Sequence, residues 1–278
     1  MESKESGRGS GSFAVLHLEF LRSNAYNKMK RALENARGDY EMIRDILDTH
    51  THTLASGHAY STIRENAHAA AEKGLELLAI TEHAPRLWGS CQSIYFQNLR
   101  VVDRSAYETE LLMGVELNIL DEQGTVDLEL RALKQMDIAI ASLHVPCIRP
   151  GSREFNTQAC INAMKNPYVS ILGHPDDARY PVDFRALVQA AKEYGVLLEL
   201  NNSSLRPGGS RKNARDMDME MLKLCMEYKA PIVMGSDAHV DSDVGRHDEA
   251  LQLLEEMNFP EDLVVNRSVE ELKKYCCH

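Results

Sequence analysis

The chain has 278 residues, 44% of them hydrophobic and 26% charged, a balance typical of a globular protein with a substantial core. No apolar run approaches the roughly 20 residues of a membrane-spanning helix, so we expect no membrane partner. The formal charge of −11 disfavours a nucleic-acid-binding surface, because such surfaces gather Lys and Arg against phosphate. The six cysteines show no C-x-x-C spacing, which favours reduced thiols in a cytoplasmic protein.

The first 41 residues differ from the rest of the chain. Residues 1–12 are rich in Gly, Ser and charge, which predicts disorder, and residues 13–36 have the apolar spacing of an amphipathic helix. The first residues of the chain carry several charges and have no continuous apolar core, so we expect no signal peptide. We therefore expect residues 1–41 to form an extension without functional residues, and residues 42–278 to form the main domain.

From residue 43 onward, short apolar runs alternate with helical patterns. Polar residues bound each run, as expected for strands that are buried on both faces. The predicted strands are 43–48, 77–81, 111–117, 137–143, 169–173, 196–201 and 231–236. Seven strands joined by helical crossovers indicate an α/β fold, either a closed parallel barrel or an open doubly wound sheet.

Local signals set the ends of the helices between these strands. Thr62 and Glu65 have the spacing of a capping box that begins one helix, and Gly74 can end it. Pro181 predicts the first turn of another helix, which Gly195 ends. Two further helices are predicted over residues 244–257 and 268–275.

Almost every predicted strand ends at residues that can bind a metal ion. A single histidine is more often a satisfied polar group than a ligand, but packing does not explain the repeated position. A closed barrel brings all its strand ends to one mouth, whereas an open sheet gathers its site at one switch point, so the pattern favours the barrel. The candidate ligands are His50, His52, His58, His83, Glu116, His144, His174, Asp237 and His239.

The spacing within this set suits metal binding. His50 and His52 are two residues apart, so on extended backbone both side chains point to the same side and can hold one ion. Asp237 and His239 repeat that spacing at the last strand. Imidazole and carboxylate ligands suit zinc, with manganese and iron as alternatives. A cluster of cations in an acidic chain would attract small anions.

Other polar residues near the strand ends are candidates for supporting roles. Arg211 can contact a phosphate through its forked guanidinium, although a solvated loop cation is equally compatible. Asn201 and Asn202 end the predicted strand that lacks a ligand and are candidates for substrate hydrogen bonds, or only for the turn. Asp48 and Glu82 can orient ligand imidazoles, or can instead bind loop amides.

Two groups of residues lie further from the strand-end pattern. Trp88 follows His83 in the next loop and is a candidate to line the pocket. The remaining histidines are predicted to be exposed: His17, His68, His247 and His278.

Five stretches resemble motifs of the PHP superfamily, named for polymerase and histidinol phosphatase domains. They are DTHTHT (48–53), SGHAYST (56–62), TEH (81–83), ELNNSS (199–204) and GSDAH (235–239). The chain is most similar to the small single-domain bacterial PHP phosphatases with three zinc ions, and the resemblance covers about residues 42–278. It implies a distorted (β/α)7 TIM-like barrel with the metal site at the carboxyl ends of the strands.

The resemblance also implies how three divalent ions would be held. The first ion would be bound by His50, His52, Glu116 and Asp237. The second would be bound by His144, His174 and the bridging Glu116, and the third by His58, His83 and His239. A metal-bound water held by Glu116, Asp237 and His50 would attack the phosphorus of a phosphate monoester. The sequence has no G-x-S-x-G elbow or Cys/His signature of a side-chain nucleophile.

The leading interpretation is therefore a metal-dependent phosphatase that acts on a small phosphorylated metabolite. A histidinol-phosphate phosphatase of histidine biosynthesis and a phosphodiesterase or nuclease are alternatives within the superfamily, and the acidic charge counts against the nuclease. A non-catalytic metal-binding module is disfavoured by the complete ligand set. Association into a homo-oligomer is left open.

Overall fold

The strands form a nearly closed parallel barrel in sequential order, from β1 to β7. The computed structural model describes residues 43–276, so the predictions for residues 1–41, His17 and His278 lie outside the described residues. The strands are β1 (Leu47–Asp48), β2 (Leu77–His83), β3 (Glu110–Asn118), β4 (Ile138–Ser142), β5 (Ile171–Leu172), β6 (Leu197–Asn201) and β7 (Ile232–Gly235).

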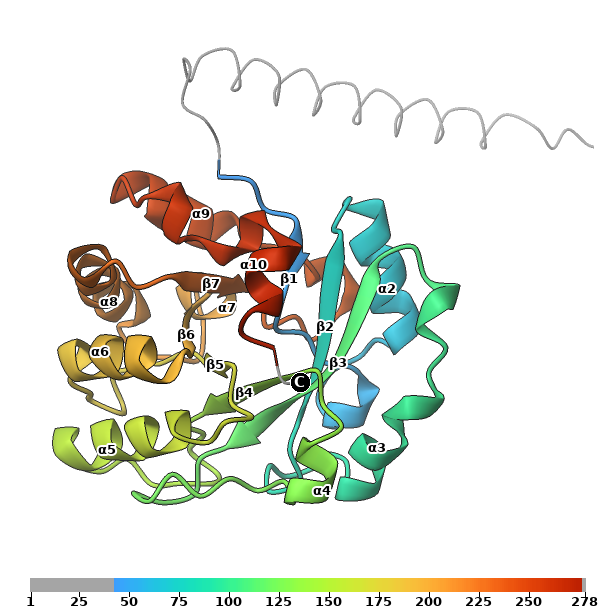
Figure 1. Ribbon diagram of the computed structural model, residues 1–278, viewed down its shortest axis with the longest axis horizontal. Coiled ribbons are helices and arrows are strands. Elements are labelled where there is room, and N and C mark those ends of the chain that lie inside the picture. Colours follow the sequence, from blue (N-terminus) through green and yellow to red (C-terminus); the bar gives the residue numbers. More distant parts are fainter. Residues whose placement is uncertain (1–42, 277–278) are drawn as a thin grey trace, which may run out of the picture. The chain divides into compact units, whose positions relative to one another are not determined.

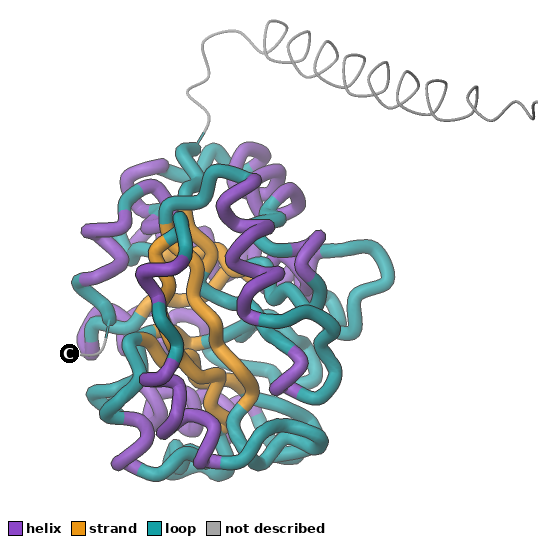
Figure 2. Tube along the Cα trace, turned by 90° about the vertical axis from the view of Figure 1, so that its right-hand side faces the viewer, coloured by secondary structure: helices purple, strands orange, loops and turns teal. Residues whose placement is uncertain are grey.

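Helices surround the strands, as Figures 1 and 2 show. They are α2 (Ile63–Glu72), α3 (Ser93–Asn98), α4 (Leu130–Leu133), α5 (Arg153–Met164), α6 (Phe184–Tyr194), α7 (Asn202–Leu205), α8 (Ala214–Tyr228), α9 (Asp248–Glu256) and α10 (Val269–Lys273). Each crossover between parallel strands carries at least one of them, which confirms the predicted α/β barrel.

The first and last strands are joined at both ends of the barrel. At the carboxyl end, the His52 amide donates to the Ala238 carbonyl at 2.9 Å. At the amino end, the Asn266 side chain lies between the two strands. Its Nδ2 donates to the carbonyls of Leu47 and Met234, both at 3.0 Å, and its Oδ1 accepts from the Met234 amide at 2.7 Å. The side chain of Asn266 thus bridges the backbones of β1 and β7, where direct hydrogen bonds between the two strands would otherwise lie.

Alternation along the strands creates two apolar layers. Because successive side chains point to opposite faces, Leu111 and Met113 of β3 pack outward against the helices while Leu112 packs inside the barrel. Leu272 of α10 is fully buried in the inner layer. The same alternation places Glu116, four residues after Leu112, on the inner face near the carboxyl end.

The predicted elements agree with the structure, apart from some boundaries. All seven strands are present, and Thr62 and Glu65 form the predicted capping box. β1 is shorter than predicted. Just before it, the Ile46 amide donates to the Asn266 carbonyl at 3.1 Å, and the Ile46 carbonyl accepts from the Glu76 amide at 2.8 Å. Pro181 does not lie in a first helical turn: α6 begins at Phe184, because the Asp183 side chain caps it by accepting from the Ala186 amide.

Two further predictions concern the described residues only. No helix within residues 43–276 is both long and apolar enough to cross a bilayer. Four of the described cysteines, Cys91, Cys147, Cys160 and Cys225, are free thiols.

Candidate metal centre

Glu116 lies at the middle of a cluster formed by all nine predicted ligands. The β2–β3 register pairs His83 with Glu116, so these residues are neighbours at the carboxyl ends of adjacent strands. Glu116 Oε2 lies 2.6 Å from His83 Nδ1. Its other oxygen, Oε1, lies 2.8 Å from His174 Nε2 and 3.2 Å from His144 Nε2. One carboxylate thus contacts imidazoles from three other strand ends.

His50 and His52 converge beside Glu116, as their spacing predicts. Their Nε2 atoms are 3.1 Å apart. Both atoms lie about equally far from Glu116 Oε2, at 3.5 and 3.6 Å, and from Asp237 Oδ1, at 3.8 and 3.4 Å. The ligand atoms of His50, His52 and Glu116 lie within 4.8 Å of one another, a spacing that could hold one metal ion, and Asp237 Oδ1 lies beside the two imidazoles.

The outer part of the cluster contains three imidazoles. His58 Nε2 and His239 Nε2 are 3.0 Å apart, and the rings of His58 and His83 stack with centroids 4.9 Å apart. His83 Nδ1 is directed toward Glu116, so His83 lies between this group and the inner one. His83, Glu116 and His144 also form a group of close ligand atoms, and this group was not predicted from the sequence.

Two atoms in the cluster lack the partners that buried polar groups normally have. Glu116 Oε2 and His83 Nδ1 have no hydrogen-bond partner among the described residues, although they lie 2.6 Å apart. Unpaired buried carboxylate oxygens are rare because they forfeit solvation without replacement. Divalent ions would fill this need, and the set of nitrogen and oxygen donors fits them.

At His52, His174 and Glu116, burial and neighbouring charges favour the protonation states of metal ligands. Burial, more than any other factor, lowers the pKa of His174 to about 4 and holds the pKa of His52 well below its usual range. Burial alone would raise the pKa of Glu116, but the facing imidazoles, His144 first, hold it well below the usual range. Neutral imidazoles and an ionised carboxylate are the forms that bind metal.

The fully buried Glu199 orients His50. Burial alone would lower the pKa of His50, but the nearby carboxylates, Glu199 first, raise it well above the usual range. Glu199 Oε1 lies 2.7 Å from His50 Nδ1. A carboxylate on Nδ1 fixes the tautomer and leaves Nε2 free for a metal ion. The sequence analysis gave Glu199 no role, although it shares the inward face of β6 with Leu197.

Gly235 makes room for Glu199. A Cβ on Gly235 would lie 2.2 Å from Glu199 Oε1, whereas a Cβ on Gly173 would clash with Ser142 Oγ, at 2.3 Å. The second oxygen of Glu199 accepts from the His174 amide at 2.8 Å. The glycine before Ser236 and Asp237 therefore reflects the space that a buried carboxylate needs between strands.

Glu82 acts on the ligands through Ser56. Ser56 Oγ donates to Glu82 Oε2 at 2.5 Å, so it accepts from His52 Nδ1 at 3.1 Å and from the His83 amide at 3.0 Å. Glu82 also accepts from the Thr53 amide. It therefore orients the ligand His52 indirectly, by ordering the loop after β1.

Asp48 binds loop groups, the second of the two roles considered for it. It accepts from the amides of His50, Ser236 and Gly245 at 2.8 to 3.2 Å. The prediction that His247 is exposed is wrong: it is fully buried, with Nδ1 2.8 Å from Asp45 Oδ2 and Nε2 3.6 Å from Asp48 Oδ1. His68, by contrast, is exposed as predicted.

Two predicted ligands have backbone conformations that L-residues rarely adopt. The φ angles of His174 and Asp237 are 28° and 53°. Such conformations are costly, persist where surrounding contacts enforce them, and concentrate at functional sites. Here the contact to the His174 amide comes from Glu199, so the same carboxylate supports two ligands.

Arg211 lies in the site, where 13% of its side chain is exposed. It donates from Nη2 to Asp237 Oδ2 at 3.0 Å, and from Nη1 to Asn201 Oδ1 at 3.3 Å and Ser204 Oγ at 3.1 Å. Asn201 is fully buried and also donates to Asp237 Oδ2 at 3.3 Å. The asparagine thus positions Arg211 and Asp237.

Asn202 is turned toward α9. Its Oδ1 accepts from the amides of Glu249 and Ala250 at 2.9 and 3.0 Å, and the residue is fully buried. This contact caps the first turn of α9, while the buried Asn202 Nδ2 has no hydrogen-bond partner among the described residues.

A pocket of about 490 Å³ opens beside the cluster. This volume lies within the usual range for small-molecule sites. Its lining includes His58, His83, His144, His239, Asp237, Arg211, Ser203, Ser210, Leu87, Trp88 and Pro146. The prediction that Trp88 lines the pocket is confirmed.

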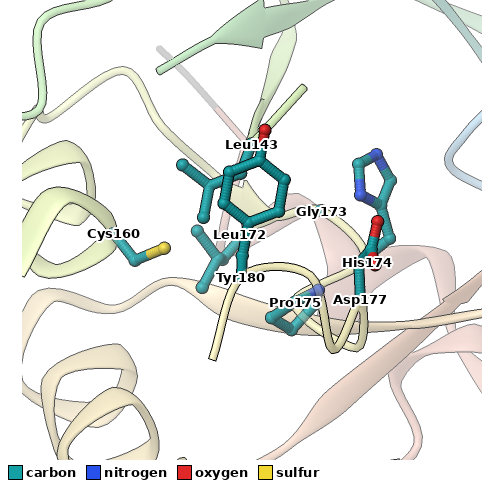
Figure 3. Close-up of a pocket in the computed structure, with 8 residues that line it drawn as sticks. All are labelled: Leu143, Cys160, Leu172, Gly173, His174, Pro175, Asp177 and Tyr180. Carbon is teal, nitrogen blue, oxygen red and sulfur yellow. The ribbon is translucent and has the colours of Figure 1, made fainter. Parts of the chain in front are cut away.

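A much smaller cavity lies behind the loop that carries His174 (Figure 3). It has a volume of about 10 Å³, which is room for one water molecule. In Figure 3, the ring of His174 points away from Cys160, which lies on the other side of Tyr180. This cavity is too small for a substrate.

Comparison with known proteins agrees with the motifs. Residues 48–258 match the family model of the PHP domain. A probable phosphatase of Caldanaerobacter subterraneus subsp. tengcongensis is 50% identical over 234 residues, which cover 84% of this chain and 91% of that protein. A probable phosphatase of Clostridium novyi is 42% identical over 230 residues, 83% of this chain and 93% of the relative.

Solved structures share the fold. Histidinol phosphate phosphatase from Lactococcus lactis, crystallised with zinc, L-histidinol and phosphate, aligns with a TM-score of 0.55 at 18% identity and covers 78% of this chain and 95% of its own. A putative histidinol phosphatase from Listeria monocytogenes aligns with a TM-score of 0.53 at 20% identity, covering 72% of this chain and 97% of its own. The matched motifs, the barrel and the long match to the family model lead to one conclusion: this chain belongs to the PHP domain family.

Proposed function

We propose that this protein is a metal-dependent phosphatase that hydrolyses small phosphate monoesters at a site for three divalent ions, with zinc as the leading candidate. The observation that carries the proposal is the convergence of nine ligand-type side chains around Glu116 beside an open pocket. The names of the relatives support phosphatase activity, and the zinc in the Lactococcus lactis structure supports the choice of metal.

The nine residues would be divided among the ions as the family resemblance implies. The inner groups would be His50, His52, Asp237 and Glu116, and then His144 and His174 with Glu116 shared. The outer group would be His58, His83 and His239. Bound divalent ions would activate a water molecule near neutral pH and stabilise negative charge on the phosphoryl group.

The chain's own residues would prepare this site. Glu199 and Ser56 fix the tautomers of His50 and His52 so that both Nε2 atoms face the ion position. Arg211, held by Asn201 and Asp237, would direct a guanidinium edge at a phosphate oxygen. Its buried charge is permanent, because the nearby carboxylates outweigh burial and raise its pKa further.

We further propose that residues 42–278 are the PHP domain, that residues 1–41 are an extension without catalytic residues, and that the protein acts in the cytoplasm. The compact unit formed by Ile43–His278 supports the first of these statements. All candidate substrates share the phosphate group, so the part of the molecule that leaves on hydrolysis distinguishes one substrate from another.

The test compares a chromogenic phosphomonoester with the matching phosphodiester, using protein loaded with zinc, manganese or iron, with and without chelator. We expect chelator-sensitive hydrolysis of the monoester and little of the diester. Preference for the diester would overturn the proposal in favour of a phosphodiesterase. Absence of turnover for both would favour a metal-binding module. Histidinol phosphate is added to the panel to test the alternative biosynthetic role.

A further inference from the structure

Trp88 is the only tryptophan of the chain, and it lies at the edge of the pocket that holds the metal cluster. It is 82% exposed, although a large aromatic side chain in a folded protein usually has much of its surface covered. No ring contact involves it within residues 43–276, so neighbouring side chains do not account for its position. An exposed indole beside a ligand site would contribute binding free energy when a ligand covers its apolar surface.

The loop that carries Trp88 is fixed against the metal site. A Cβ on Gly57 would lie 2.0 Å from the Gly89 carbonyl oxygen, so this loop abuts the loop that carries His58. The Leu87 amide donates to the Ala84 carbonyl at 3.2 Å, which closes a turn just before the indole. The backbone of Trp88 is thereby held beside the loop that carries His58.

The lining of the pocket is chemically mixed. Leu87, Trp88 and Pro146 contribute apolar surface, while Ser203, Ser210 and Arg211 contribute hydroxyl groups and a charge. Metal ligands line the remaining part. Bound cations and Arg211 would bind the phosphate group of a substrate, whereas an apolar indole offers a phosphate no favourable contact.

We propose that Trp88 is the platform for the leaving group, and that the substrates carry a planar, aromatic or heteroaromatic group next to their phosphate ester. This inference rests on the proposed phosphatase function. The phosphate would lie at the metal cluster and Arg211, the flat group would stack on the indole, and the serines would accept or donate hydrogen bonds at its edge. Stacking on an aromatic side chain tolerates many rings, so it selects a class of substrate and not one compound.

Because the chain has one tryptophan, its fluorescence reports on this contact directly. Metal-loaded protein is titrated with phenylphosphonate, methylphosphonate and inorganic phosphate, none of which contains a hydrolysable ester. We expect phenylphosphonate to change the emission saturably, and the other two to compete with it while changing the emission little. Equal changes with all three ligands, or no change with phenylphosphonate, would overturn the proposal. So would emission that depends on protein concentration alone, which would place Trp88 between copies of the chain.

Kinetics then measure specificity. In W88A, kcat/KM for phenyl phosphate should fall about 5- to 150-fold, the range for loss of one stacking contact. Glycerol 1-phosphate should change by no more than about twofold, and W88F should restore most of the activity on phenyl phosphate. The control is L54A, which removes another exposed apolar side chain outside the pocket lining and should affect neither substrate.

The outcomes separate the two proposals. Equal losses on both substrates in W88A would refute the role of Trp88 and leave the phosphatase proposal standing. If the wild-type protein hydrolyses neither substrate, the phosphatase proposal fails, and the fluorescence titration still decides whether the pocket binds a planar anion.

Discussion

Glu199 and His50 form a carboxylate–imidazole pair with no exposed surface, and Glu199 Oε1 lies 2.7 Å from His50 Nδ1. The pair is placed by β6, the strand on which the sequence shows no metal ligand. Glu199 therefore determines how His50 presents its other nitrogen, and its second oxygen holds the unusual backbone of His174. One carboxylate thus contacts predicted ligands of both proposed inner groups.

The substitution Glu199→Gln tests this relationship. The amide keeps the shape of the side chain but cannot hold the His50 tautomer through a charged acceptor, so metal affinity or kcat/KM should fall about 10- to 100-fold. Competition with a chelator measures the affinity. The matched control is Glu227→Gln, whose carboxylate pairs with Arg185 at the surface and should leave both quantities unchanged. Wild-type metal affinity in Glu199→Gln would contradict the assignment.

Glu116→Gln tests the shared carboxylate. Both oxygens of Glu116 face imidazoles of different groups, so the substitution should lose or weaken two ions together and abolish activity. Metal content per chain, measured by elemental analysis, checks the count, and circular dichroism checks that the fold is kept. Loss of a single ion would disprove bridging, and full activity would remove Glu116 from the site.

The barrel and its ligands could be predicted because they depend on local patterns. Buried parallel strands are continuous apolar runs, and in a barrel all their carboxyl ends meet, so one-dimensional register was enough to bring His50, His144 and His239 into one cluster. Boundaries were less predictable. At β1, for example, Ile46 and Leu47 form hydrogen bonds with Asn266, a residue more than 200 positions away, which no local pattern indicates.

Buried supporting residues could not be found in the same way. Glu199 and His247 both make contacts with residues far apart in sequence, so local patterns do not identify their partners. A glutamate inside an apolar strand was one available signal, because an unpaired charge there would be costly. His247 lies just before α9, where an exposed histidine is the commoner outcome.

Substitution of Arg211 tests the phosphate contact. Hydrogen bonds to charged groups contribute about 1.5–3 kcal/mol, so Arg211→Ala should raise KM about 10- to 150-fold, with a smaller increase in Arg211→Lys. Arg206→Ala is the control, because Arg206 pairs with Asp243 at 2.6 Å and does not line the pocket. Metal content is measured alongside, since Arg211 also contacts Asp237. Unchanged KM and kcat in Arg211→Ala would remove the phosphate contact.

His247 should make the stability of the fold depend on pH. Burial alone would lower its pKa, but Asp45 and Asp48 outweigh burial and raise it to about 10 from the ordinary value of 6.5. The folded state therefore binds a proton more tightly than the unfolded state. Its contribution to stability is complete below pH 6.5 and is lost as the pH rises from there to about 10, by up to roughly 1.4 kcal/mol per pH unit.

Urea unfolding of the wild type and His247→Gln at several pH values, with metal saturating, isolates this contribution. Other groups titrate equally in both proteins, so the difference in unfolding free energy reports on His247. We expect the variant to be less stable at pH 6 and the difference to shrink steadily toward pH 10. A difference that stays constant over this range would mean that His247 is neutral in the folded protein, and that Asp48 is held by its amide donors and Ser236 without help from an imidazolium.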